Sequence, residues 1–171
     1  AKSMEADLLM AGTYFPDAVL IARTIAELQY KPKYVLLTAG VSDYKYGKEL
    51  GNVANNIIGT AWWHDSVSFS LDWTQRYKER FGRVPDYHAA GAYAAAQILQ
   101  QAVTATESLD NTKIRDYIRN NSFDTVIAQA LSFDDRGAPS YSMVTLQWQE
   151  GELKVVWPPK AQTSKPRPYT P

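Results

Sequence analysis

Three almost continuous apolar runs, at residues 7–12, 34–40 and 56–63, constrain the fold of this chain more than any other feature. Uninterrupted apolar runs are typical of strands that are buried on both faces, as in parallel sheets. An amphipathic helix pattern at 16–29 separates the first two runs, and a short helix is expected within 43–51 before the third. The order strand, helix, strand, helix, strand therefore predicts an α/β fold with a parallel sheet and right-handed crossovers.

The middle of the chain is predicted to be helical. We expect helices at 67–85, 86–106 and 111–121. The first of them carries aromatic residues four apart, which are Phe69, Trp73, Tyr77 and Phe81. This spacing favours one face of a helix packed on a core over a platform on which nucleic-acid bases stack.

The end of the chain is predicted to be β-structure followed by a tail. Strands are expected near 125–132, 141–149 and 153–157, and "QEGE" between the last two is a plausible tight hairpin turn. The segment 159–171 is polar and proline-rich, so we expect an extended or loosely ordered tail.

Composition excludes several classes of protein. The 18 basic and 18 acidic side chains cancel, which argues against a nucleic-acid partner. No cysteine is present, so disulfides, thiol nucleophiles and zinc–thiolate sites are excluded. No apolar run approaches the roughly 20 residues that span a bilayer. Because "AKSMEADLLM" leads directly into a core strand, we expect an N-terminally truncated chain from which any signal segment is missing.

No motif in the sequence indicates catalysis or cofactor binding. In "GVSDYKYGKEL" six residues separate the glycines and Glu49 follows Lys48, so the stretch does not fit a phosphate-binding P-loop. The two acids of "FDDRG" at 133–137 favour a turn over a glycosidase pair. The only histidines, His64 and His88, are 24 positions apart, and Ser42 is the only candidate nucleophile at a strand end. We therefore expect no enzyme activity, no cofactor and no metal.

The positive signal comes from the positions where the predicted strands end. Ligands of open parallel sheets bind beyond the carboxyl ends of the strands. Those ends are 13–15, 38–42 and 62–64, which supply aromatic rings, hydroxyl groups and a glycine backbone. Such residues suit a binding cleft with apolar walls and a few polar anchors. The alternative is that these aromatic residues only cap the sheet.

Several stretches resemble a known family. They are "YKERFGRVP" from Tyr77 to Pro85, the "AY" at 92–93 that opens an alanine-rich helix, and "SFDDRG" ahead of a hairpin. Their order and spacing resemble the C-terminal half of the periplasmic substrate-binding proteins of branched-chain amino acid type ABC transporters. The resemblance covers nearly the whole chain except the tail, but only about half of a family member.

The resemblance implies two α/β lobes that close on a ligand, of which this chain holds a part. Residues 1–64 and 125–158 would belong to the second lobe and 65–124 would be helices of the first, with most of the first lobe missing. We therefore expect the chain to pair with its missing half or with another copy, through exchange of the helices at 67–121. A fold of this class would be a parallel-sheet lobe with flanking helices and a C-terminal β-hairpin.

The resemblance also implies a function and a site. It predicts the periplasmic solute-binding component of an ABC importer, with a membrane permease as partner; the alternative is the ligand-sensing domain of a regulator or receptor with the same fold. The predicted ligand-binding residues are Tyr14, Phe15, Thr38, Ala39, Gly40, Trp62 and Trp63.

Ala39 bears on the ligand that the resemblance implies. The amino-acid binders of the family carry an acidic residue before the glycine, where it holds the ligand's ammonium group, and here that position is Ala39. A buried ammonium without such a partner would be destabilised by several kcal/mol, unless Asp43 replaces the missing carboxylate. The rings of Tyr14, Trp62 and Trp63 therefore favour an aromatic carboxylate over a standard amino acid.

Overall fold

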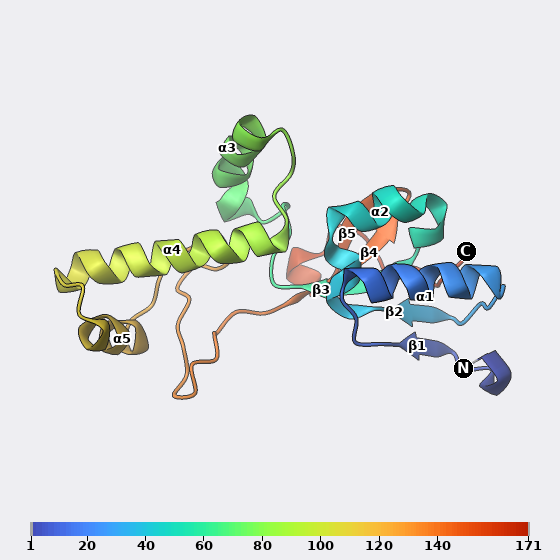
Figure 1. The fold of residues 1–171 in the computed structure, drawn as a ribbon, viewed down its shortest axis with the longest axis horizontal. Helices are drawn as coiled ribbons and strands as arrows, with labels where there is room; N and C mark the ends of the chain where they lie inside the picture. The colour runs from blue at the N-terminus through green and yellow to red at the C-terminus, as the bar shows by residue number, and fades with distance from the viewer. Residues whose placement is uncertain (1, 171) are drawn as a thin grey trace. The chain divides into compact units, whose positions relative to one another are not determined.

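The computed structural model describes residues 2–170, and these residues form one five-stranded sheet with the strand order β1-β2-β3-β4-β5. The strands are β1 (Leu8–Met10), β2 (Tyr34–Leu36), β3 (Ile57–Ala61), β4 (Val144–Gln149) and β5 (Glu152–Trp157). β1, β2 and β3 are parallel neighbours, whereas β3–β4 and β4–β5 pair antiparallel. The predicted α/β class is confirmed, and the C-terminal hairpin extends the same sheet (Figure 1).

The chain divides into two compact units. Unit 1 comprises Ala1–His64 and Met143–Pro171, and unit 2 comprises Asp65–Ser142. The sequence-based division grouped 125–142 with the sheet, whereas in the structure these residues lie with the helices. Ala1 and Pro171, the outermost residues of the predicted division, lie outside the described residues.

Unit 1 contains the sheet and helices α1 (Phe15–Glu27) and α2 (Tyr44–Leu50). α1 matches the predicted helix: Pro16 lies in its first turn, where no intrahelical N–H donor is needed. Its buried side chains, Ala18, Val19, Ala22 and Ile25, recur at helical spacing. Asp43 caps α2, since its carboxylate accepts a hydrogen bond from the Lys45 N–H at 2.8 Å.

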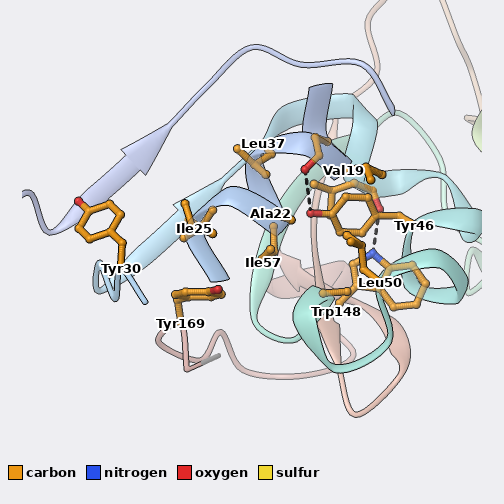
Figure 2. Packing of buried hydrophobic residues seen from close by; sticks show 14 residues of the cluster. Val19, Ala22, Ile25, Tyr30, Leu37, Tyr46, Leu50, Ile57, Trp148 and Tyr169 are labelled. Atoms are coloured by element: carbon orange, nitrogen blue, oxygen red, sulfur yellow. Dashed lines mark hydrogen bonds between the residues drawn. The ribbon is translucent and has the colours of Figure 1, made fainter. Parts of the chain in front are cut away.

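The core of unit 1 lies between these helices and the sheet (Figure 2). Tyr46 from α2 and Trp148 from β4 are both buried, with ring centroids 6.5 Å apart. The indole Nε1 of Trp148 donates to the Val41 carbonyl at 2.8 Å, so its polar atom is satisfied. Gly47 lies against the Trp148 ring so closely that a Cβ at this position would overlap it.

Unit 2 contains α3 (Leu71–Phe81), α4 (Tyr87–Thr106) and α5 (Asn111–Asn120). Three rings of the aromatic stripe lie in tilted contact, with centroids 5.6 Å apart for Trp73–Tyr77 and 4.5 Å apart for Tyr77–Phe81. Trp73 is buried, but Phe69 precedes the helix and is exposed, as is Phe81. The stripe therefore packs as predicted only around its centre.

The strand predicted near 125–132 is wrong. Within the described residues this stretch makes only an isolated bridge between Phe123 and Leu131. The Thr125 hydroxyl accepts hydrogen bonds from the N–H groups of Ile127 and Ala128, at 3.2 and 3.1 Å. These local bonds fold the backbone into a turn, which competes with pairing in a sheet.

Two predicted turns are confirmed. Glu150 and Gly151 both have positive φ, 55° and 81°, and connect β4 to β5 as a two-residue hairpin. In "FDDRG" the Asp134 carboxylate accepts from the N–H groups of Arg136 and Ala138, at 3.0 and 2.7 Å, so this acid shapes a turn.

Short 3₁₀ turns complete the described chain, at Lys2–Met4, Thr38–Ser42, Gly51–Ala54, Ser68–Ser70 and Pro159–Ala161. The segment 159–171, which was predicted to be an extended tail, begins with the 3₁₀ turn Pro159–Ala161. Its residues from Gln162 to Thr170 form neither helix nor strand. None of the helices within residues 2–170 has the length and hydropathy needed to cross a membrane.

Candidate functional site

The candidate site lies at the carboxyl ends of β1, β2 and β3. Because these strands are parallel, the segments that follow them leave the sheet at the same edge. The segments are the link into α1, the 3₁₀ turn Thr38–Ser42, and the residues after Ala61. Together with Phe15, the first residue of α1, they carry all of the residues predicted to bind a ligand.

Two threonines join the first two segments. The Thr38 hydroxyl accepts from the Thr13 N–H at 2.8 Å and donates to the Thr13 carbonyl at 3.1 Å. The Thr13 hydroxyl donates to the Leu37 carbonyl at 2.6 Å, and the Gly40 N–H donates to the Thr13 carbonyl at 3.2 Å. This set, which we call the threonine clasp (Thr13, Thr38 and Gly40), fixes the two strand ends against each other.

Gly40 is required by the closeness of the two segments. A Cβ on Gly40 would overlap the Tyr14 carbonyl oxygen and would lie 2.6 Å from the carbonyl carbon and 2.8 Å from the Ala18 Cβ. Gly40 and Thr38 therefore position the site through the backbone, rather than offering free groups to a ligand.

Tyr14 presents an open ring at this edge. Its side chain is 75% exposed, while its carbonyl accepts the Ala18 N–H and so starts α1. Phe15, the next residue, is partly buried and packs against the hydrophobic core. The two adjacent aromatic residues, both predicted to bind the ligand, therefore differ: Tyr14 is exposed, whereas Phe15 packs against the core.

The 3₁₀ turn Thr38–Ser42 contains no carboxylate that could bind a ligand. Ala39 is half-buried between Thr38 and Gly40. Asp43, the nearest acid along the chain, accepts the Lys45 N–H and caps α2. The carboxylate that would hold an ammonium group is therefore not supplied at position 39, and Asp43 is engaged in the fold.

Trp62 and Trp63 follow the end of β3. Trp63 is 3% exposed and Trp62 is half-buried, as expected for neighbouring residues that point to opposite sides of an extended chain. His64 follows them, and its Nε2 lies 3.1 Å from the Leu153 carbonyl of β5. This contact ties the end of β3 to the hairpin.

Ser42 does not act as a nucleophile in this arrangement. It is buried, and its hydroxyl donates to the Thr60 carbonyl at 3.0 Å. A serine nucleophile needs a neighbouring base within hydrogen-bond reach, whereas the partner of this hydroxyl is a peptide carbonyl.

The sequence-based set omitted Thr13, whose N–H, hydroxyl and carbonyl all form hydrogen bonds at this edge. The available signal was a threonine at the end of each of two adjacent apolar runs. The predicted residues lie on unit 1, and none of them lines either of two hollows in unit 2, which measure about 230 and 490 Å³. The candidate site is an edge of the sheet in unit 1.

The chain is similar to known proteins over most of its length. A family model described as periplasmic binding protein matches residues 1–152. The Leu/Ile/Val-binding protein homolog 7 of Brucella suis is 24% identical over 180 residues, which cover 97% of this chain and 45% of the relative. The chain therefore spans less than half the length of this relative.

Two solved structures share the fold. A leucine-binding protein from Thermotoga maritima superposes with a TM-score of 0.80 at 23% identity, covering 90% of this chain and 44% of that one. A solute-binding protein from R. palustris, solved in complex with benzoate, has a TM-score of 0.77 at 12% identity and covers 91% of this chain and 43% of that one.

Proposed function

The chain belongs to the periplasmic binding protein family, and from this premise we propose that it contributes one jaw of an extracytoplasmic solute receptor that serves an ABC importer. Its predicted resemblance to the branched-chain amino acid type and its predicted partial α/β fold are confirmed by the relatives and structures it matches. The observation that carries the proposed function is the exposed Tyr14 ring at the carboxyl edge of β1–β3, directly after Thr13 of the threonine clasp.

This edge suits binding rather than chemistry. It offers an aromatic face and backbone groups, and its one serine is engaged with a carbonyl. Closure of a second lobe over the ring would bury it together with the solute, as in hinge-bending receptors. A membrane permease would then be the partner that receives the solute.

We propose an aromatic carboxylate, or a similar organic acid, as the solute. Ala39 stands where an amino-acid receptor of this type needs a carboxylate, and Asp43 is engaged as a helix cap. The Tyr14 ring supplies an aromatic contact worth roughly 0.5–1.5 kcal/mol beyond its buried area. The benzoate complex of the R. palustris protein supports this ligand class, and the leucine-binding protein of Thermotoga maritima represents the competing one.

We further propose that unit 2 pairs with another part of the protein or with another copy of the chain. The amphipathic helix α5 has no buried residue, and large apolar side chains of unit 2 are exposed, among them Phe69, Leu99 and Leu109. Exposed apolar surface of this kind is typical of an interface. Sedimentation that shows a compact, stable monomer of this chain alone would contradict the pairing.

A thermal-shift screen on the protein in its natural length tests the ligand. Benzoate and related acids would be compared with leucine, isoleucine and valine. A solute at 100 times its Kd stabilises the folded form by about 2.7 kcal/mol. We expect this stabilisation from an aromatic acid. Stabilisation by leucine and by no aromatic acid would overturn the ligand class, and stabilisation by no small organic solute would overturn the receptor function.

Two variants locate the site. Tyr14→Ala should lose the ligand-induced shift while the protein stays folded, because the ring is largely exposed. Leu20→Ala is the matched control, since Leu20 is a similarly exposed side chain of α1 in the same unit. An equal ligand response from both variants would exclude Tyr14 from the site.

A further inference from the structure

The proline-rich segment after β5 is bound to unit 1 along most of its length. We call residues 163–170, "TSKPRPYT", the strap. Sequence alone predicted an extended or loosely ordered tail, and the strap is extended, without helix or strand. Its backbone and several of its side chains nevertheless find specific partners, which lie on β4, on β5 and at the residues that precede β2 and β3.

Two buried glutamines of β4 form hydrogen bonds with the middle of the strap. Gln147 is fully buried, and its side-chain amide pairs with both backbone groups of Arg167: Nε2 donates to the carbonyl at 2.7 Å, and Oε1 accepts from the N–H at 2.9 Å. A glutamine amide has the same donor and acceptor as a peptide group, so Gln147 replaces a neighbouring strand.

Gln149 extends this arrangement. Its Nε2 donates to the Lys165 carbonyl at 2.9 Å and to Gln147 Oε1 at 2.7 Å, and its Oε1 accepts from the Ser164 hydroxyl at 2.7 Å. Gln149 is 3% exposed. Buried amides that are satisfied in this way specify one binding register, because an unpaired group would be strongly unfavourable.

Both ends of the strap are also fixed. At its start, Thr163 exchanges bonds with Val155 of β5: the Thr163 N–H donates at 2.8 Å and its hydroxyl accepts at 2.9 Å. At its end, the Tyr169 N–H donates to the Lys33 carbonyl at 2.8 Å. The Thr170 hydroxyl accepts from Asn56 Nδ2 at 2.8 Å.

Tyr169 anchors the strap in the core. It is 4% exposed and belongs to the same hydrophobic cluster as Ile25 and Tyr30 (Figure 2). An aromatic anchor in a buried pocket is the usual centre of a peptide-recognition surface. Pro166 and Pro168, on either side of Arg167, restrict the strap to extended conformations before it binds, which reduces the entropy lost on binding.

We propose that this surface of unit 1 is a peptide-binding site whose occupant is the chain's own strap. The site, which we call the seat, consists of Gln147, Gln149, Asn56, Lys33 and the pocket that holds the Tyr169 ring. Lys33 and Asn56 directly precede β2 and β3, so the strap joins the amino ends of these strands to the hairpin. The candidate ligand site lies at the opposite, carboxyl ends. The seat therefore does not depend on the proposed function.

Hydrogen exchange on the intact protein tests whether the strap is seated. The N–H groups of Arg167 and Tyr169 should exchange at least about 100-fold more slowly than in a free peptide, as expected for amides that open only in local unfolding. Tyr169→Ala should remove this protection. Lys165→Ala is the control, because the Lys165 side chain is exposed and only its backbone contacts the seat. Free-peptide exchange rates in the unmodified protein would overturn the proposal.

Cleavage tests whether the seat recognises the strap as a separate peptide. A protease site at Gln162 would be cut after folding, and gel filtration with mass spectrometry would follow the released fragment. The fragment should co-elute with the protein and exchange with an added synthetic peptide of the same sequence. The Tyr169→Ala fragment should bind at least about 100-fold more weakly, given the usual effect of removing a buried aromatic side chain. Immediate loss of the unmodified fragment would refute the seat.

Discussion

Replacement of Gly40 by alanine tests the structural basis of the candidate site. The new Cβ would meet the Tyr14 carbonyl, with the carbonyl carbon at 2.6 Å, and the Ala18 Cβ at 2.8 Å. Neither neighbour can rotate away, because one is backbone and the other is the Cβ of Ala18, a fully buried residue of α1. The segment that carries Tyr14 must therefore move.

The expected magnitude follows from two destabilising effects and one stabilising effect. Overpacking of a rigid site destabilises a protein by about 1–3 kcal/mol, and movement of the Tyr14 carbonyl weakens its bond to the Ala18 N–H by about 1 kcal/mol. Lower entropy of the unfolded chain offsets about 0.4–1 kcal/mol. We expect a net loss of about 2 kcal/mol in the free energy of unfolding, measured by urea titration.

Gly12→Ala is the matched control in the same segment. A Cβ there would meet no atom within 4 Å, so this variant should be neutral or slightly stabilised. Because the Gly40 variant displaces Tyr14, it should also lose most of the response to an aromatic acid, whereas the Gly12 variant keeps it. Equal stability and equal ligand response of the two variants would refute the reasoning.

Three further predictions concern the core and the ligand class. Gly47→Ala should destabilise unit 1 by about 1–3 kcal/mol and change the near-ultraviolet circular dichroism, because its Cβ would overlap the Trp148 ring; an unchanged spectrum would contradict this contact. Burial raises the pKa of Tyr46 above its ordinary value of 10.0, so the stability that its neutral form provides is present below pH 10.0 and is lost as the pH rises further. Tyr46→Phe should therefore flatten the alkaline loss of stability in urea titrations, and an unaltered pH profile would exclude this group. Ala39→Asp should weaken the response to benzoate and favour leucine in calorimetry, since it supplies a carboxylate beside Gly40; an unchanged preference would exclude position 39 from the site.

The first half of the fold was predictable because local and global signals agree there. The apolar runs at 7–12, 34–40 and 56–63 contain the three parallel strands, and α1 starts one residue before the predicted helix at 16–29. Burial gives β3 and the centre of β2 their apolar sequences, which a pattern can detect. β1 was expected to be buried as well, but it is an edge strand in which Leu8 and Met10 are 51% and 65% exposed. The prediction at 125–132 failed because the Thr125 side chain, rather than hydrophobicity, decides the local backbone.

The candidate site was only partly predictable. The exposed position of Tyr14 at the sheet edge was predictable, since a strand end followed by a helix start places it there. The roles of Thr13 and Gly40 depend on the distance between two loops that are about 25 residues apart in sequence, as the separation of Thr13 and Thr38 illustrates. The spacing of residues in the sequence does not reveal how close these two loops lie in the fold. The seat of the strap was missed for the same reason, because Gln147 and Arg167 meet only in the folded sheet.

A crystal structure of the natural-length protein with a bound solute from the thermal-shift screen tests the central claim most directly. The account predicts an aromatic acid whose ring lies against Tyr14, next to the backbone of residues 38–40. A solute bound away from the carboxyl ends of β1–β3, or an ammonium group held by Asp43, would contradict it.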